Sequence, residues 1–182
     1  MIKYNICFIR RGDELLLLNR NFAPWMGRWN GVGGKLEANE TPRDAMIREI
    51  REETGIEGYG LEYKGMITWN DDDASFGGMY LYVAEVEGSF DYATPLETDE
   101  GILHWRPIDW IMDANNGGVV SNIRRFLEAA LQEPHCYEHH CYYRGDELVS
   151  FQSSRISPLT ENDARLREAC LREAHSEILS VK

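Results

Sequence analysis

The sequence predicts an α/β fold in which helices cover a mixed β-sheet. Two observations carry this prediction: short apolar runs of strand length recur between turn residues, and longer segments carry the signals of amphipathic helices. The length of 182 residues, of which 43% are hydrophobic and 27% charged, suits one globular domain with a full core. Helices packed on such a sheet give an α/β sandwich. We expect a main domain over residues 1–151 and a C-terminal linker and helix over 152–182.

The first half of the chain supplies most of the expected strands. Tyr4 to Ile9 and Glu14 to Leu18 form two apolar runs, separated by turn residues at 11–13. The stretch 29–34 that follows is rich in glycine, which lets the backbone approach a ligand closely. Further strands are expected over 61–69, 78–86 and 102–106, with the acidic stretch 70–73 as a solvated hairpin loop.

The segment 41–55 has clear helix start and stop signals. Thr41 is a good N-cap, and Pro42 suits the first helical position. Asp44, three residues after Thr41, approximates a capping box and favours the positive end of the helix dipole. Gly55 ends the helix because glycine adopts positive φ readily.

The second half of the chain is expected to form a helix, a hairpin and a final helix. Ser121 is the expected cap of a helix that runs through Gln132, with an apolar stripe at helical spacing. A hairpin over 137–151 turns at 144–146. We expect a linker before an amphipathic helix over 160–179. The linker is marked by Ser153, Ser154, Ser157 and Pro158.

Charge and composition exclude some classes of function. The net charge of −12 argues against binding of polymeric nucleic acid through its backbone. It allows a small anionic substrate, because bound divalent metals reverse the local charge. No apolar run reaches membrane-spanning length and the N-terminus has no secretory pattern, so a cytoplasmic protein without a membrane partner is expected. The oligomeric state stays open.

The segment His135 to Cys141 gathers three histidines and two cysteines. These are the ligands that zinc prefers, and one interpretation is a zinc site. The segment also has the pattern of a strand, in which alternation would send these side chains to two faces. We favour the strand, with the four cysteines of the chain as free thiols in a reducing compartment.

The helix at 41–55 carries a cluster of carboxylates. Glu49 lies three residues before Glu52 and four before Glu53, so the three share one face. Arg48 and Glu52 are four apart and can pair. Three acidic groups at one place repel each other unless a cation lies among them. Such oxygen-rich sites suit Mg²⁺ or Mn²⁺. The alternative is a solvated acidic helix face.

The residues around this helix fill every fixed position of the pattern G-x5-E-x7-R-E-U-x-E-E-x-G-U, where U is a bulky aliphatic. The matching residues are Gly34, Glu40, Arg48, Glu49, Ile50, Glu52, Glu53, Gly55 and Ile56. The segment resembles the Nudix box, the signature of hydrolases that cleave nucleoside diphosphates linked to another group. The resemblance implies the Nudix α/β/α sandwich, here with a C-terminal hairpin and an extra helix.

The run 27–35 resembles that of the MutT-type, or 8-oxo-dGTP, diphosphatases. This resemblance implies hydrolysis of a nucleoside triphosphate, such as an oxidised purine nucleotide, to the monophosphate and pyrophosphate. It implies Glu49, Glu53 and the carbonyl of Gly33 as metal ligands, with Glu52 beside them. It makes Glu100 a ligand or general base, with an exposed acidic loop as the alternative. Arg48 would orient the carboxylates. Lys35 is either a phosphate contact or an exposed lysine.

Base recognition is expected from two asparagines. Asn30 matches a position of these relatives that faces the base, and an amide offers both a donor and an acceptor. Asn122 matches a second such position, where relatives have Asn or an Asp pair. Each asparagine has a structural alternative: Asn30 would hold a turn, and Asn122 would cap a helix. Trp25, Trp29, Trp105 and Trp110 are candidates for a stacking wall or for the core.

Two other functions stay open. A Nudix hydrolase could act on ADP-ribose, a nucleotide sugar or a dinucleoside polyphosphate, although such subfamilies tend to carry Pro or Tyr where this chain has Asp-Asp-Asp-Ala at 71–74. A non-catalytic nucleotide-binding module is the second alternative. It is disfavoured because the box keeps all its carboxylates.

Overall fold

The computed structural model describes residues 2–70 and 76–179, with the backbone alone over 173–179. Within these residues a nine-stranded mixed sheet has the order β6-β7-β2-β1-β5-β4-β8-β9, with β3 beside β2. The pairs β1–β5 and β4–β8 are parallel, and the other pairs are antiparallel. The predicted α/β fold is therefore confirmed. The expected acidic loop and the Asp-Asp-Asp-Ala stretch lie largely at 71–75, outside the described residues.

The expected strands and helices are present, most of them longer than predicted. Four short elements, β3, β6, α2 and the 3₁₀ helix η1, were not predicted, and the last helix begins at Ala164 instead of residue 160. The strands are β1 (Tyr4–Arg11), β2 (Glu14–Arg20), β3 (Trp29–Asn30), β4 (Gly60–Asn70), β5 (Phe76–Glu85), β6 (Leu96–Thr98), β7 (Gly101–Pro107), β8 (Cys136–Arg144) and β9 (Glu147–Ile156). The helices are α1 (Pro42–Thr54), α2 (Ile108–Met112), α3 (Ile123–Gln132), the 3₁₀ helix η1 (Pro158–Glu161) and α4 (Ala164–Leu179).

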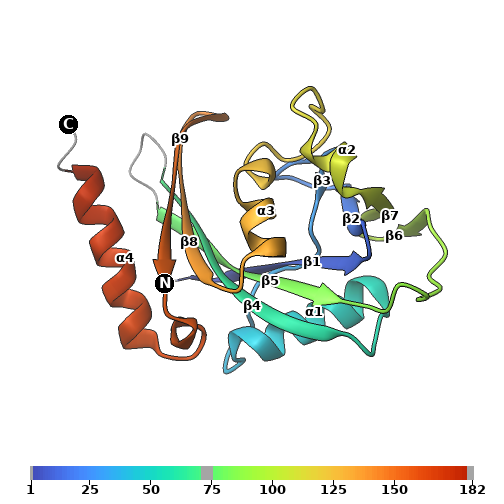
Figure 1. The fold of residues 1–182 in the computed structure, drawn as a ribbon, viewed down its shortest axis with the longest axis horizontal. Coiled ribbons are helices and arrows are strands. Elements are labelled where there is room, and N and C mark those ends of the chain that lie inside the picture. Colours follow the sequence, from blue (N-terminus) through green and yellow to red (C-terminus); the bar gives the residue numbers. More distant parts are fainter. Residues whose placement is uncertain (1, 71–75, 180–182) are drawn as a thin grey trace.

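The helices α1 and α3 cover opposite faces of the sheet (Figure 1). Strand β2 shows the division most clearly, since all four of its leucines are buried. Leu16 and Leu18 belong to the core under α1, together with Met46 of that helix. Leu15 and Leu17 belong to the second core, under α3. Alternation along the strand therefore assigns successive residues to two separate cores.

The caps of α1 are those that the sequence predicts. The Thr41 hydroxyl accepts a hydrogen bond from the Asp44 backbone N–H at 3.1 Å and donates one to the Asp44 carboxylate at 2.7 Å. Gly55 has φ of 68° and ends the helix. Because both ends are fixed by local contacts, the carboxylates of α1 have a defined position relative to the preceding loop.

Two expectations about the second half were wrong. Ser121 does not cap α3: the helix begins at Ile123, and Asn122 has the N-cap position without a side-chain hydrogen bond to the helix. Ser153 and Ser154 are not linker residues, because β9 continues to Ile156 and pairs with β8 along that whole length. Cross-strand pairing overrides the low strand propensity of serine here. The division of domains at residue 151 stays a prediction.

The C-terminal segment is attached to α1 and to the sheet by a polar network. The Arg43 guanidinium of α1 pairs with the Glu161 carboxylate at 2.9 Å, and the Tyr82 hydroxyl donates to the same carboxylate at 3.0 Å. The hydroxyls of Thr160 and Tyr63 are 3.1 Å apart. Figure 1 shows α4 beyond this attachment, alongside β9. None of the helices that the structure describes is both long and apolar enough to cross a bilayer.

Candidate functional site

Arg48 is the centre of the acidic site on α1. Its guanidinium donates to both carboxylate oxygens of Glu40, at 2.7 and 3.0 Å. One nitrogen also donates to Glu49 and to Glu52, each at 2.9 Å, and another to the Lys35 carbonyl at 3.2 Å. The bidentate bond from Arg48 holds the pKa of Glu40 well below its usual value. The fixed spacing of the box therefore lets the Arg48 guanidinium bind the loop and the carboxylates of α1 at the same time.

Two consecutive glycines bring the loop against the carboxylates of α1. The Gly33 N–H lies 3.4 and 3.3 Å from the two carboxylate oxygens of Glu53 and donates to them. A Cβ on Gly34 would lie 2.5 Å from Oε1 of Glu49. The flanking Val32 N–H and Gly34 carbonyl pair with Cys7 and Asn5 of β1. The loop is thus held by β1 on one side and faces Glu49 and Glu53 on the other.

The site has an excess of negative charge, carried by the half-buried Glu49 and Glu53 and the exposed Glu100. Burial, followed by the nearby carboxylates of Glu49 and Glu100, raises the pKa of Glu53 to about 8, against the opposing Gly33 hydrogen bond. Burial also raises the pKa of Glu49, and its hydrogen bond from Arg48 opposes that rise. Glu100 lies at the β6–β7 turn, where its carbonyl accepts the Asn21 N–H at 2.9 Å. Glu49 and Glu100 therefore lie near enough to act on Glu53 electrostatically, while the Glu52 side chain is 55% exposed.

These residues fit a divalent cation. After burial, the neighbouring carboxylates raise the pKa of Glu53, and a cation would neutralise their charge. Carboxylate and carbonyl oxygens are the ligands that Mg²⁺ prefers. In the part of the chain that the structure describes, three such side chains do not surround a common point. Arg48 engages one oxygen of Glu49 and one of Glu52.

Arg20 is a residue of this site that no motif in the sequence indicates. It follows Leu16 and Leu18 at intervals of two along β2, so its side chain starts on the face of α1. Its positive charge lowers the pKa of Glu53, and its Nε is buried without a hydrogen-bond partner among the described residues. Extending the predicted strand by two residues would have placed it here.

The substrate-contact candidates lie on the loop that leads to the box. The Lys35 side chain is exposed, and its backbone carbonyl binds Arg48. The Asn30 side-chain oxygen accepts the Gly31 N–H at 3.0 Å, which is the turn-holding contact of the structural alternative. This bond uses one oxygen lone pair, and the amide N–H groups of Asn30 are not engaged by it.

Asn122 lies in a segment that pairs with the Asn30 loop. Its side-chain amide contacts the Cys141 sulfur of β8 at 4.0 Å. The Trp29 N–H donates to the Gly118 carbonyl at 2.8 Å, and the Val120 N–H donates to the Trp29 carbonyl at 3.1 Å. We call these two hydrogen bonds the Trp29 bridge. It brings the chain around Asn30 and the chain that leads to Asn122 side by side. Trp25, Trp29 and Trp110 pack against the α3-side core, and Trp105 is buried in the other core.

The histidines and cysteines at 135–141 are divided by strand alternation, as predicted. The His139 ring lies among Phe126, Tyr137 and Phe151, on the α3 side. The His140 Nδ1 is 2.8 Å from the Thr68 hydroxyl, which also donates to Glu138 at 2.8 Å. Strand β8 thus distributes these side chains between two faces, and they do not converge.

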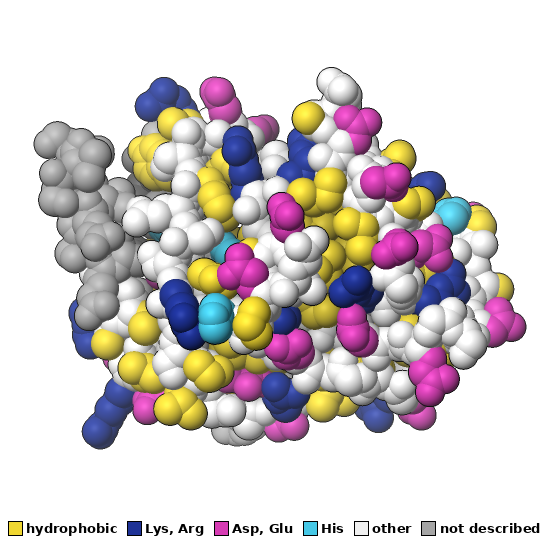
Figure 2. All heavy atoms as spheres, viewed as in Figure 1, with side chains coloured by type: hydrophobic (Ala, Val, Ile, Leu, Met, Phe, Trp, Pro, Cys, Tyr) yellow, Lys and Arg dark blue, Asp and Glu magenta, His cyan; other side chains and the backbone are white. Residues whose placement is uncertain are grey.

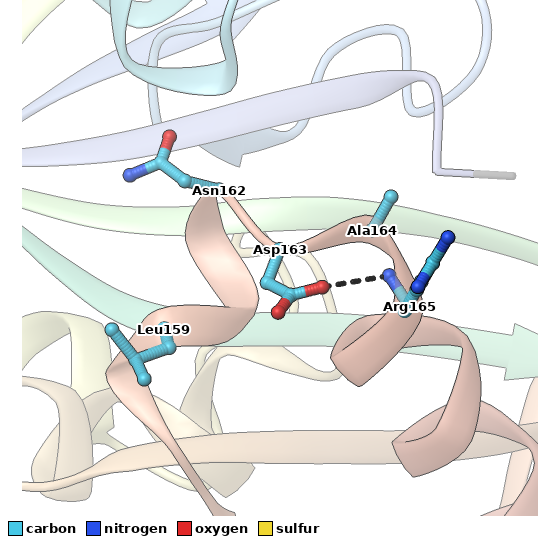
Figure 3. A pocket seen from close by; sticks show the side chains of 5 residues that line it. All are labelled: Leu159, Asn162, Asp163, Ala164 and Arg165. Atoms are coloured by element: carbon cyan, nitrogen blue, oxygen red, sulfur yellow. Dashed lines mark hydrogen bonds between the residues drawn. The ribbon is translucent and has the colours of Figure 1, made fainter.

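The surface has a second feature, remote from the carboxylates. A hollow of about 460 Å³ lies where α4 begins, and Asp163 accepts the Arg165 N–H there at 2.9 Å (Figure 3). This is an ordinary helix cap. Figure 2 shows acidic and basic side chains interspersed over the face drawn there, around a central group of hydrophobic ones. That face does not present the continuous basic surface that polymeric nucleic acid needs.

Comparison with known proteins gives one family. The NUDIX domain model matches residues 3–129. The chain is 35% identical over 111 residues to the uncharacterized Nudix hydrolase YvcI of Bacillus subtilis, covering 59% of this chain and 66% of that protein. It is 41% identical over 64 residues to the CTP pyrophosphohydrolase of Escherichia coli, covering 35% of this chain and 47% of that protein. The matches thus span less than two thirds of either curated relative.

A solved structure gives the same result for the fold. The crystal structure of the MutT protein from Bacillus halodurans superposes with a TM-score of 0.66 at 26% sequence identity. The superposition covers 83% of this chain and 96% of that one. The α/β/α arrangement implied by the box is therefore found over most of the chain.

Proposed function

This chain belongs to the Nudix hydrolase family, and we propose that it hydrolyses a nucleoside triphosphate to the nucleoside monophosphate and pyrophosphate. One observation carries the proposal: a half-buried carboxylate, Glu53, accepts the Gly33 N–H and is influenced electrostatically by Glu49, Glu100 and Arg20. Paired carboxylates with a nearby guanidinium suit a substrate that arrives as a metal-bound polyphosphate.

We propose Mg²⁺ or Mn²⁺ as the cofactor, held by the carboxylates of Glu49 and Glu53 and by the Gly33 carbonyl. The Gly33 carbonyl is a suitable metal ligand, because the hydrogen bonds to β1 are made by the neighbouring Val32 and Gly34 and not by Gly33. When bound, the cation supplies neutralisation of phosphate charge and a water of lowered pKa. Arg48 and Glu52 hold the ligand carboxylates in place rather than touching the substrate.

The remaining residues act on the phosphates and on a proton. Glu100 acts on Glu53 electrostatically and is our candidate for the base that accepts the proton of the attacking water. Among the residues that the structure describes, the Nε of Arg20 has no hydrogen-bond partner, which suits binding of a phosphate oxygen. Lys35 is the second phosphate candidate. No activated serine or cysteine is needed, since water is the nucleophile.

For the base we propose an oxidised purine, such as that of 8-oxo-dGTP, read by Asn30 and Asn122. The support is the run 27–35, the Trp29 bridge between the two segments, and the likeness to a MutT structure. The likeness to a CTP pyrophosphohydrolase supports a triphosphate substrate with a different base. We further propose a cytoplasmic enzyme that sanitises the nucleotide pool and acts on small molecules, not on polymeric nucleic acid.

A substrate panel tests this proposal. With Mg²⁺ present, kcat/KM is measured for 8-oxo-dGTP, 2-hydroxy-dATP, dGTP, CTP, ADP-ribose and a nucleotide sugar. We expect triphosphates to be cleaved to monophosphate and pyrophosphate, with oxidised purines preferred. Equal turnover of dGTP and 8-oxo-dGTP would remove the sanitising role. A preference for ADP-ribose or the nucleotide sugar would mean that the substrate is another nucleoside diphosphate derivative and not a nucleoside triphosphate.

A further inference from the structure

Arg106 of β7 lies in an aromatic cluster that the catalytic arrangement does not use. Its guanidinium carbon is 4.2 Å from the centroid of the Trp29 ring and 4.9 Å from that of Trp110. The two indole rings are nearly perpendicular, with centroids 6.4 Å apart, so the cation lies in the corner between them. His104 contacts the Trp29 ring edge-on, at 6.3 Å between centroids.

The positive charge of Arg106 is partnered by the faces of aromatic rings and not by a carboxylate. None of the ion pairs between described residues includes it, and its Nε is buried without a hydrogen-bond partner. Burying a cation in this way is costly unless the ring faces compensate it. The cluster is therefore a defined contact, and removal of the charge should loosen both rings.

Both aromatic partners of Arg106 are tied to the segment that leads to Asn122. Trp29 makes the Trp29 bridge to Gly118 and Val120. The Trp110 carbonyl accepts the Asn116 side-chain N–H at 2.9 Å, and the Asn116 oxygen accepts the Gly118 N–H at 3.0 Å. Two chains of contacts thus run from Arg106 to the 116–120 backbone, one through each tryptophan.

We propose that Arg106 is a positioning residue that, by holding Trp29 and Trp110, fixes the spacing between Asn30 and the segment ending at Asn122. This spacing sets which base the enzyme accepts. The inference rests on the proposed function, in which those two asparagines read the base. Arg106 itself touches neither the phosphates nor the carboxylates, since β7 directs it to the α3 side of the sheet, beside Trp29.

The first test measures the bridge without any substrate. Amide hydrogen exchange is followed at Trp29 and Val120 in Arg106→Met, Arg106→Lys and a control, Arg11→Met. The control removes a similar contact, because the Arg11 guanidinium lies 4.1 Å from the Trp105 centroid, in the other core. We expect exchange at both amides to accelerate by about tenfold in Arg106→Met. The control should leave both rates unchanged, and lysine should largely restore them. Unchanged exchange in Arg106→Met would overturn the inference.

The second test measures selectivity. The ratio of kcat/KM for 8-oxo-dGTP to that for CTP is compared across the same variants. We expect the ratio to shift by about fivefold or more in Arg106→Met, through KM, with kcat for the preferred nucleotide within about twofold of wild type. A loosened bridge with an unchanged ratio would overturn the role in selectivity. If the wild type cleaves none of the triphosphates while the bridge loosens, the proposed function has failed, and the positioning by Arg106 is retained.

Discussion

The backbone of Gly34 lies directly against the carboxylate of Glu49. A Cβ at this glycine would be 2.7 Å from both the carboxyl carbon and Oε2. The φ of Gly34 is not in the left-handed region, so alanine tests the contact alone. We expect Gly34→Ala to displace Glu49 and to lower kcat/KM by roughly 10–100-fold, as for a misplaced metal ligand. Gly60→Ala is the control, since a Cβ there meets nothing within 4 Å. Full activity of Gly34→Ala would show that catalysis does not depend on the position of the Glu49 carboxylate.

The three box carboxylates should differ in their importance. Glu53→Gln is expected to lower kcat by about 10²–10⁴-fold, because it removes the half-buried carboxylate at the centre of the site. Glu52→Gln should cost less, since Glu52 is 55% exposed and hydrogen-bonds to Arg48 at the surface. Steady-state kinetics at saturating Mg²⁺ measures both, and thermal unfolding shows whether each variant is folded. A Glu53→Gln enzyme with full Mg²⁺-dependent turnover would contradict the catalytic assignment.

Arg48 should act through metal affinity. Arg48→Met releases Glu40, Glu49 and Glu52 at once, and we expect the Mg²⁺ concentration for half-maximal activity to rise by roughly 10–100-fold. Lysine should not restore the affinity, because an ammonium cannot bind carboxylates as a planar fork. The control is Arg51→Met, an exposed arginine of the same helix. Equal effects of the two substitutions would count against the orienting role.

His139 should make stability fall in mild acid. Burial lowers the pKa of its ring to about 4, whereas an unfolded histidine has a pKa of about 6.5. Between these values the unfolded chain binds the additional proton, so native stability is lost as pH falls from 6.5 towards 4. His139→Phe keeps the aromatic stack and removes this loss. The free energy of unfolding is measured with denaturant at several pH values. Relative to wild type, that of the variant should rise by on the order of 3 kcal/mol as the pH is lowered from neutral to 4. If the difference in unfolding free energy between variant and wild type did not change with pH, the lowered pKa of His139 would be contradicted.

The pair Arg43–Glu161 should couple the C-terminal segment to α1. A double-mutant cycle with Arg43→Met and Glu161→Gln is expected to give a coupling free energy of roughly 1–2 kcal/mol. The carboxylate is largely buried and also binds Tyr82, which is why the pair should exceed a surface ion pair. The free energy of unfolding measures this coupling. Additive effects of the two substitutions would mean that the segment is held by other contacts.

The sequence predicts α1 well because its determinants are local. Thr41, Pro42 and Gly55 specify the ends of the helix, and the box spacing identifies the family before any contact is known. The arrangement of Glu53 against Gly33 and Glu100 depends on β1 and β7 as well, so the sequence alone gives the participants without their distances. Arg20 was missed because the strand was predicted to end at Leu18.

The errors in the second half have tertiary causes. Ser153 and Ser154 belong to β9 because β8 offers them a ladder, which serine propensity does not indicate. Ser121 is a good cap by type, yet the chain enters α3 one residue later. The cluster of Arg106, Trp29 and Trp110 joins β7, β3 and α2, elements of which two were not predicted. Contacts between elements distant in the sequence leave no periodic pattern to read.

The alternation of β2 has a consequence for how such an enzyme can change over time. Leu16, Leu18 and Arg20 lie on the side of the acidic helix, whereas Leu15 and Leu17 share the other core with Trp29. Substitutions in one core leave the packing of the other largely intact, because a side chain in a strand contacts one face only. Residues on the α3 side can therefore be exchanged with little effect on the packing beneath the carboxylate-bearing helix α1.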